Sequence, residues 1–266
     1  MAFGKNIFMS RLKIQYYTKI LRGKLDTKQR IAKALSRAGV ASRRQVEKLV
    51  LGGRVSVNGD VIDDPATKVA LIDKILVDGK LVALPQNSRI WRYNKPIGLV
   101  TSNSDEKGRA TIYDKLPKTL PRTMSVGRLD LQSEGLLLLT NDGELKRYLE
   151  LPTSELVRRY RVRAHGVHNE KLISKLRAGI QIDGQKFRPM SVRLDKIQGS
   201  NMWYAVALKE GRNREIRRAF SQINLSVNRL IRISFGPFEL GALPKGAVEE
   251  VPPTVHIEGW GSVAGA

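Results

Sequence analysis

One aspartate, Asp130, is the residue of this sequence best placed to do chemistry. It ends the segment Gly127–Asp130, and the apolar run Leu136–Leu139 follows a few residues later. A carboxylate between a glycine turn and a buried strand can be held rigidly at the mouth of a cleft, where it can attack a substrate or exchange a proton. The same pattern also suits an ordinary turn or capping aspartate with Arg128 as its surface partner, and spacing alone favours that interpretation.

A second candidate is the alternating segment Arg158–Ala164. Alternation predicts a strand with Arg159, Arg161 and Arg163 on one face and Tyr160, Val162 and Ala164 on the other. Tyr160 could line a pocket and stack on a base, or it could simply be a core tyrosine. Spacing alone favours the core.

The third candidate is the basic segment Glu210–Phe220. Ile216 and Phe220 are spaced to anchor a helix to the core. Arginines gather around the start of this helix, where they can bind phosphates and still leave one guanidinium for a carboxylate. These arginines are Arg212, Arg214, Arg217 and Arg218. An exposed basic helix without a ligand is the alternative.

Several kinds of chemistry are excluded or disfavoured by what the sequence lacks. There is no cysteine, so a thiolate nucleophile and a cysteine zinc site are excluded. The three histidines, His165, His168 and His256, have no acidic partner at metal-ligand spacing, so we predict no metal site. Neither a Gly-x-Gly-x-x-Gly sequence nor a phosphate-binding loop occurs, and we therefore expect no nucleotide or other cofactor.

The charge of the chain predicts a polyanionic partner. The 266 residues include 47 Lys and Arg against 25 Asp and Glu, a net charge of +22, spread along the whole length. No apolar run is long enough to span a bilayer, and we expect no membrane association. Residues 1–25 contain six basic residues and no acid before Asp26. They could be an organelle-targeting segment, although an RNA-contacting arm or a basic leader is favoured, and we expect a cytoplasmic protein.

Residues 29–62 predict a small helical unit closed by a hairpin. Apolar residues at helical spacing predict a first helix that Gly39 ends. Ser42 and Gln45 have capping-box spacing and predict the start of a second helix. Asn58-Gly59, between short alternating segments, predicts a tight hairpin, and Ile75–Leu81 predicts another.

The basic residues of this unit are placed to meet a phosphate backbone. Arg30, Lys33 and Arg37 are spaced to share one face of the first helix. Arg43 and Arg44 start the second helix, where free backbone N–H groups favour anions. The alternative is a solubilising face with no ligand.

The whole pattern predicts an α+β protein. Residues 1–28 form a basic N-terminal extension, 29–88 an RNA-binding domain with its linker, 89–254 a catalytic domain and 255–266 a C-terminal tail. In the catalytic domain, apolar strands alternate with short helices and turns, which favours a mixed, mostly antiparallel sheet.

Two resemblances to known families sharpen these expectations. Residues from about Gln29 to Asp73 resemble the S4 RNA-binding domain, which implies RNA binding. Residues from roughly Gln29 to Pro253 as a whole resemble the RsuA/RluB type of ribosomal RNA pseudouridine synthase with an N-terminal S4 domain. The resemblance is carried by several motifs in series: Asn94–Gly98, Asp105–Arg109, Gly127–Asp130 with Ser133–Glu144, Gly211–Arg218 and Leu230–Ile233.

This second resemblance implies a role for four residues. Asp130 matches the catalytic aspartate, and Arg217 matches the arginine that pairs with it, which would keep the carboxylate ionised. Arg128 matches the arginine that displaces the target uridine, and Tyr160 the tyrosine that packs on the flipped base. Arg158 and Ala219 stand where the family frequently has Lys and Met, and neither touches the implied reaction.

The implied activity is conversion of a uridine to pseudouridine in ribosomal RNA, by a monomer without a cofactor. The sequence favours the large-subunit 23S rRNA over the 16S rRNA. It leaves open whether Asp130 attacks C1′, attacks C6 or acts as a base. A non-catalytic S4-type RNA-binding or ribosome-assembly protein is one alternative. An RNA base methyltransferase is another, although no adenosylmethionine loop is seen.

Overall fold

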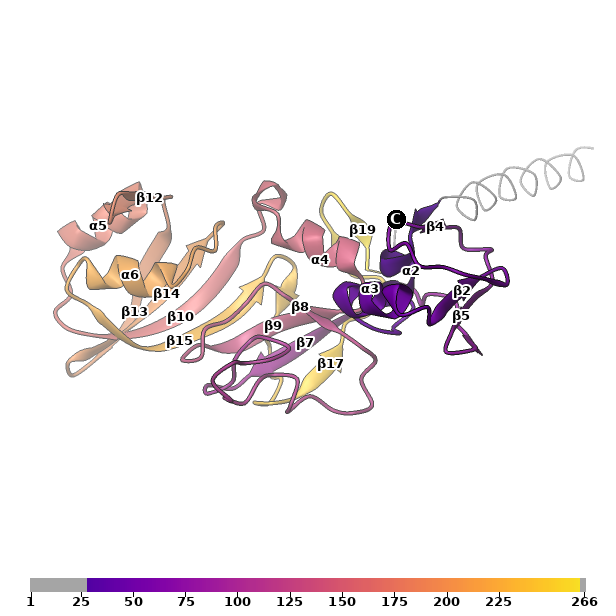
Figure 1. The fold of residues 1–266 in the computed structure, drawn as a ribbon. Helices are drawn as coiled ribbons and strands as arrows, with labels where there is room; N and C mark the ends of the chain where they lie inside the picture. The colour runs from indigo at the N-terminus through magenta and orange to yellow at the C-terminus, as the bar shows by residue number, and fades with distance from the viewer. Residues whose placement is uncertain (1–27, 264–266) are drawn as a thin grey trace, which may run out of the picture. The chain divides into compact units, whose positions relative to one another are not determined.

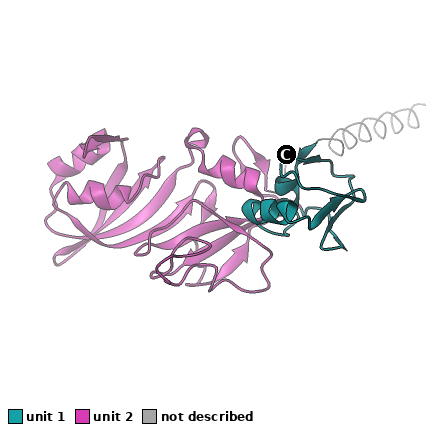
Figure 2. Cartoon of the chain, viewed as in Figure 1, with its two compact units in different colours: residues 1–86 teal, residues 87–266 magenta. Residues whose placement is uncertain are grey.

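The computed structural model describes residues 28–263. The chain divides into two compact units, Met1–Gln86 and Asn87–Ala266 (Figure 2). Except for Lys28, the basic extension predicted for residues 1–28 lies outside the described residues.

Two short helices and six short strands make up the first unit (Figure 1). In chain order its elements are β1 (Gln29–Arg30), α2 (Ile31–Arg37), α3 (Arg43–Leu51), β2 (Val55–Val57), β3 (Asp60–Val61), β4 (Lys68–Val69), β5 (Ile75–Val77) and β6 (Lys80–Leu81). Strands β3, β2, β5 and β6 form one antiparallel sheet, and β1 pairs with β4.

The local signals in this unit act as predicted. Ser42 and Gln45 form a complete capping box at the start of α3. Asn58 and Gly59 both have positive φ, 54° and 106°, as the tight turn between β2 and β3 requires. The apolar faces of α2 and α3 meet in a core whose central residues, including Ile31 and Val46, are fully buried.

The second unit is built on one large sheet. The strands of the whole unit, including two small hairpins outside this sheet, are β7 (Ile90–Lys95), β8 (Met124–Val126), β9 (Glu134–Thr140), β10 (Arg158–His165), β11 (Ile180–Ile182), β12 (Gln185–Phe187), β13 (Ser191–Gln198), β14 (Asn201–Leu208), β15 (Ser226–Phe235), β16 (Phe238–Glu239), β17 (Val248–Glu250), β18 (His256–Ile257) and β19 (Gly261–Ser262). Its helices are α4 (Gly143–Glu150), the 3-10 turn η1 (Pro152–Ser154), α5 (Glu170–Ala178) and α6 (Glu215–Ser221).

The large sheet has nine strands, in the order β13-β14-β10-β15-β9-β7-β17, with β16 added to β15 and β8 to β9. All its pairs are antiparallel except β15 with β9. The predicted α+β class, with a mixed and mostly antiparallel sheet, is therefore confirmed.

Helices cover one face of the sheet, α5 and α6 over β13, β14, β10 and β15, and α4 over β9 (Figure 1). Phe187, Tyr204 and Phe220 fill the core under α5 and α6, and each is fully buried. A separate core joins Tyr93, Leu137 and Leu129, and so anchors the segment before Asp130 to β7 and β9.

The end of the chain differs from the expectation of a tail at 255–266. Strands β18 and β19 form a hairpin, and Ile257 and Val263 are buried against α4 in the core of the second unit. Apolar residues at the two sides of a glycine turn explain why this segment packs: Gly259 has a φ of 74°, and Trp260 lies 5.3 Å from Tyr148 between ring centroids.

Candidate active site

Backbone contacts hold the loop that carries Asp130 on both sides of the residue. Before it, Leu129 is buried, and its backbone N–H and carbonyl both bond the Thr101 hydroxyl, at 3.3 and 2.8 Å. After it, the Gly98 N–H donates to the Leu131 carbonyl at 2.8 Å, and the Ser133 N–H donates to the Asp130 carbonyl at 3.0 Å. The loop is therefore rigid where the sequence requires a rigid carboxylate.

Gly135 fixes where β9 starts after this loop. Its φ is 99°, and a Cβ at this position would lie 2.3 Å from the Arg232 carbonyl oxygen of β15. Any side chain would separate the two parallel strands, so glycine is required for the close approach that places the Asp130 loop beside β15.

The Asp130 carboxylate is half-buried and available to a substrate. Within residues 28–263 it makes no hydrogen bond and no ion pair, although Lys95 and Arg217 both lie near enough to feel its charge. A carboxylate whose oxygens are not engaged can either attack a substrate or remove a proton.

Lys95 is the cation buried beneath this loop. It is fully buried, and its Nζ donates to the carbonyls of Pro96 (3.0 Å), Asp130 (3.2 Å) and Ser133 (2.9 Å). Burial lowers the pKa of Lys95 to about 8, against the opposing attraction of Asp130 and Glu134. The sequence motif Asn94–Gly98 marked this segment, but nothing in it showed that the lysine side chain would turn inward under Asp130.

Arg217 reaches the Asp130 loop from helix α6, but it contacts the main chain. Its guanidinium donates to the Gln132 carbonyl at 2.8 Å and to the Val227 carbonyl at 2.7 Å. The ion pairs among residues 28–263 do not include the expected one between Arg217 and Asp130. Burial lowers the pKa of Arg217, the nearby Arg214 lowers it further, and Asp130 opposes both effects. Arg217 thus ties α6 to the loop, and its charge acts on Asp130 without a direct bond.

Tyr160 lies in the sheet close to this loop. It is 9% exposed and belongs to the core under α5 and α6, as spacing alone favoured. Across the strands it pairs with Arg232 of β15, which in turn pairs with Gly135 of β9. Tyr160, Arg232 and Gly135 therefore form one row across three adjacent strands, and the row ends five residues after Asp130.

Three buried polar atoms near this row have no partner among the described residues. They are Ser133 Oγ, Arg217 Nε and Arg232 Nη2. A buried donor without an acceptor costs about 1–3 kcal/mol. Their grouping around the Asp130 loop is typical of a site that receives a polar ligand.

The remaining predicted arginines of the second unit surround the start of α6. Arg212 and Arg214 are exposed, and Arg214 caps the helix with a φ of 49°. Arg218 pairs with Asp183 at 3.0 Å and lies over the Phe187 ring. Arg128 is exposed and makes no hydrogen bond or ion pair within the described part of the chain. We call Arg212, Arg214 and Arg218, which surround the start of α6, the basic rim.

A pair of carboxylates, missed at the sequence level, supports this rim. Glu215 is 4% exposed and accepts the Arg212 N–H at 2.9 Å, and Glu210 accepts the Arg188 N–H and the Arg212 Nε–H at 2.6 and 3.0 Å. Burial and, to a smaller extent, the nearby Glu210 raise the pKa of Glu215 to about 7. Both carboxylates accept hydrogen bonds from Arg212, so together they fix the turn that presents Arg212 and Arg214.

This pair predicts a pH-dependent stability. An unfolded glutamate titrates near 4.5 and the folded Glu215 near 7, so between these values the folded protein binds more protons than the unfolded chain. Stability should therefore fall as pH rises through this window and level off above it. We expect Glu215→Gln to raise the free energy of unfolding at pH 8 by roughly 1–3 kcal/mol, with little effect at pH 4.

Denaturant titrations of both proteins from pH 4 to pH 8 measure this difference. Glu239→Gln, at an exposed residue, is the matched control. A stability difference between Glu215→Gln and the parent that stays constant over this range would contradict the assignment.

In the first unit, the basic residues lie as follows. Arg43 and Arg44 are exposed and form the first turn of α3. Arg30 differs from the expectation: it lies just before α2, in the short strand β1, because its backbone pairs with Lys68. Lys33 and Arg37 are half-buried on α2.

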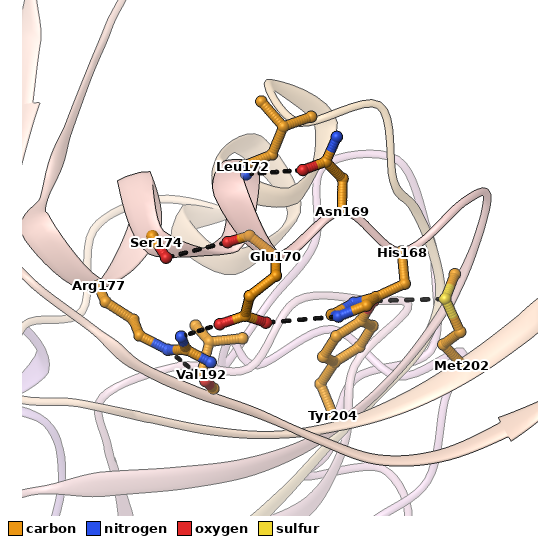
Figure 3. A network of polar contacts seen from close by, with 9 residues as sticks. All are labelled: His168, Asn169, Glu170, Leu172, Ser174, Arg177, Val192, Met202 and Tyr204. Atoms are coloured by element: carbon orange, nitrogen blue, oxygen red, sulfur yellow. Dashed lines mark hydrogen bonds and ion pairs between the residues drawn. The ribbon is translucent and has the colours of Figure 1, made fainter.

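One of the three histidines, His168, has a structural setting. His168 Nδ1 lies 3.1 Å from the Tyr204 hydroxyl, and Nε2 lies 3.4 Å from Glu170, so an acidic partner is present that spacing did not reveal (Figure 3). Arg177 holds the same glutamate and the Val192 carbonyl. The network connects the start of α5 to the sheet. In the described part of the chain, no three His, Asp or Glu side chains are grouped as a metal site would require.

Comparison with known proteins defines the class to which this fold and site belong. Residues 29–75 match the S4 domain, and residues 89–222 match the family described as RNA pseudouridylate synthase. A solved structure described as a pseudouridylate synthase covers 84% of this chain and 96% of its own, with a TM-score of 0.57 and 25% identity. No helix among the described residues is long and apolar enough to cross a membrane.

Curated relatives of this chain are also named as pseudouridine synthases. A protein of Rickettsia felis named "Uncharacterized RNA pseudouridine synthase" is 48% identical over 223 residues, which cover 84% of this chain and 96% of the relative. "Ribosomal large subunit pseudouridine synthase B" of Haemophilus influenzae is 37% identical over 92% of this chain and 71% of its own length. The chain belongs to the RNA pseudouridine synthases, as a member with an N-terminal S4 domain.

Proposed function

We propose that this enzyme isomerises a specific uridine of 23S ribosomal RNA, with Asp130 as the catalytic residue. Support for the large subunit comes from the relatives of Haemophilus influenzae and Salmonella typhi, both named large-subunit synthases and both 37% identical to this chain. Support for the residue comes from the unpartnered Asp130 carboxylate on a rigid loop beside Lys95 and Arg217.

The reaction exchanges one bond to the sugar for another. The bond from N1 of uracil to C1′ breaks, the base turns, and a bond from C5 to C1′ forms. The hydrogen on C5 leaves to solvent, and N1 gains a proton. Covalent or proton-transfer help from Asp130 suffices for these steps without a change of oxidation state.

The other site residues have supporting roles in this proposal. The uridine must leave its stack, which costs a few kcal/mol, and Arg128 occupies the vacated position. Tyr160 packs against the extruded base. Arg217 and Lys95 hold the Asp130 loop through its main-chain carbonyls. The basic rim, Arg212, Arg214 and Arg218, binds the neighbouring phosphates.

Release of tritium from C5-labelled uridine tests the substrate. We expect release from 23S rRNA transcripts and none from 16S transcripts. Mapping of pseudouridines in rRNA from cells lacking the protein should then show one missing site in the large subunit. Release from 16S rRNA alone would overturn the assignment of the subunit.

The S4 domain is expected to bind the RNA backbone at the start of α3. Arg43→Ala combined with Arg44→Ala removes two exposed charges beside free backbone N–H groups. The slope of log K against log salt should flatten by about one to two units, because each lost phosphate contact contributes about 0.7 to 0.9.

Filter binding of an rRNA fragment at several salt concentrations measures that slope. Lys48→Ala, in the last turn of the same helix, is the comparison and should change it less. If the double variant keeps the parental slope, these arginines do not touch phosphate.

A further inference from the structure

The large sheet of the second unit has a second face, and none of the site residues described above lies on it. Strands β10, β14, β13 and β15 turn one face toward α5 and α6, where Val162, Tyr204 and Val206 are buried (Figure 1). Cross-strand partners share a face, so the register defines the residues on the opposite side. We call them the arginine face: Arg159, Arg161, Arg163, Arg193, Lys196, Trp203 and Arg229.

An arginine and a tryptophan stack at the centre of this face. The Arg161 guanidinium lies 4.9 Å from the centroid of the Trp203 ring, and Arg229 lies 5.9 Å from it. Arg161 is exposed, and Trp203 is half-buried between its cross-strand partners Arg163 and Lys196. An exposed guanidinium plane on an aromatic ring is a surface on which an unpaired base can continue the stack.

The positive charge of this face is largely uncompensated. Arg159, Arg161 and Arg163 have no carboxylate partner within residues 28–263, and Arg163 bonds only the Asn228 side chain, at 2.8 Å. Only Arg193, with Asp195 at 3.1 Å, and Arg229, with Glu134 at 2.5 Å, are paired. Three arginines in successive positions of one strand face repel each other unless an anion lies across them, and phosphate matches their geometry.

The arginine face continues toward the catalytic loop. Arg229 pairs with Glu134, which starts β9 four residues after Asp130 and also binds Lys245. Trp203 on β14 is separated from β9 by three strand spacings of about 4.8 Å, or roughly 14 Å.

We propose that the arginine face binds an unpaired segment of the substrate RNA outside the catalytic site, with phosphates on Arg159, Arg161 and Arg163 and one base stacked on Arg161 and Trp203. The inference rests on the proposed RNA substrate. It assigns to this surface a contribution to affinity and none to the chemical step.

The test uses the full chain and a labelled rRNA stem-loop with unpaired flanks. Arg159→Gln with Arg161→Gln should flatten the salt slope by about one to two units and raise Kd about tenfold or more. Trp203→Leu should raise Kd by about 5- to 100-fold and Trp203→Phe less, because phenylalanine keeps a ring. In tritium release, KM should rise while kcat at saturating RNA stays unchanged.

Matched controls separate this surface from general charge. Lys171→Gln with Lys175→Gln removes two exposed charges from α5, over the other face of the sheet, and should leave Kd within about twofold. Parental Kd, slope and KM in both the arginine and the tryptophan variants would overturn the inference. Equal or tighter binding of poly-glutamate at this face, lost in the same variants, would assign it to an acidic protein partner and overturn it too.

These outcomes are distinct from failure of the proposed function. If the parent protein releases tritium from 23S rRNA but the variants behave as the parent, only the arginine face is refuted. If the parent releases none, the assignment of the substrate fails, while the difference in RNA affinity is still measured.

Discussion

Asp130→Asn is expected to lower the rate of pseudouridine formation by about 10⁴-fold or more, which places it below detection in an ordinary assay. Asparagine has nearly the same shape as aspartate, but its amide neither attacks a sugar or base nor takes up a proton at neutral pH. The loop should survive, because its contacts run through the backbone of Leu129, Leu131 and Ser133.

Three measurements on this variant are decisive. Tritium release from C5-labelled RNA reports turnover, filter binding reports affinity, and thermal unfolding reports the fold. We expect no release, a Kd within about twofold of the parent and an unchanged midpoint of unfolding. Retained turnover would remove Asp130 from the mechanism, whereas lost binding would mean that its carboxylate acts in recognition.

Lys95→Met is expected to have the second largest effect. Its Nζ bonds three carbonyls, those of Pro96, Asp130 and Ser133, and methionine leaves them without a donor in a buried place. The lost bonds should cost about 2–4 kcal/mol, partly offset because the buried charge is also removed. The loop should then lose its fixed position, and kcat should fall by roughly 10²-fold or more.

The matched control for this variant is Lys118→Met, at an exposed lysine. Denaturant unfolding and tritium release at saturating RNA measure the two effects. Arginine at 95 restores the charge but not the fit, so Lys95→Arg should also lose activity. A Lys95→Met enzyme with parental kcat would show that the three carbonyl contacts do not position Asp130.

Lys95 and Arg217 together explain how the fold presents one carboxylate. Each donates to main-chain carbonyls of the loop, so the position of Asp130 is held without a partner on its own side chain. Among the described residues neither carboxylate oxygen of Asp130 has a hydrogen-bond partner, and its charge acts on the pKa of both Lys95 and Arg217.

The sequence by itself determined the elements whose signals are local. The capping box of Ser42, the turn at Asn58-Gly59 and the alternation around Tyr160 depend only on neighbouring residues, and each forms as predicted. The serial motifs also identified the family, because their order along the chain is itself information. The apolar hairpin after Val255 escaped prediction, since its partners on α4 lie about a hundred residues earlier.

Only the tertiary structure decided how charged groups distant in sequence meet. Lys95 turns under Asp130, Arg217 bonds Gln132 instead of the aspartate, and Glu210 and Glu215 meet at Arg212. Strand register likewise brings Arg161 and Arg229 to Trp203. Spacing along the chain fixes which residues share a face of one element, but pKa values and ion pairs depend on distances between elements and on burial, which packing alone sets.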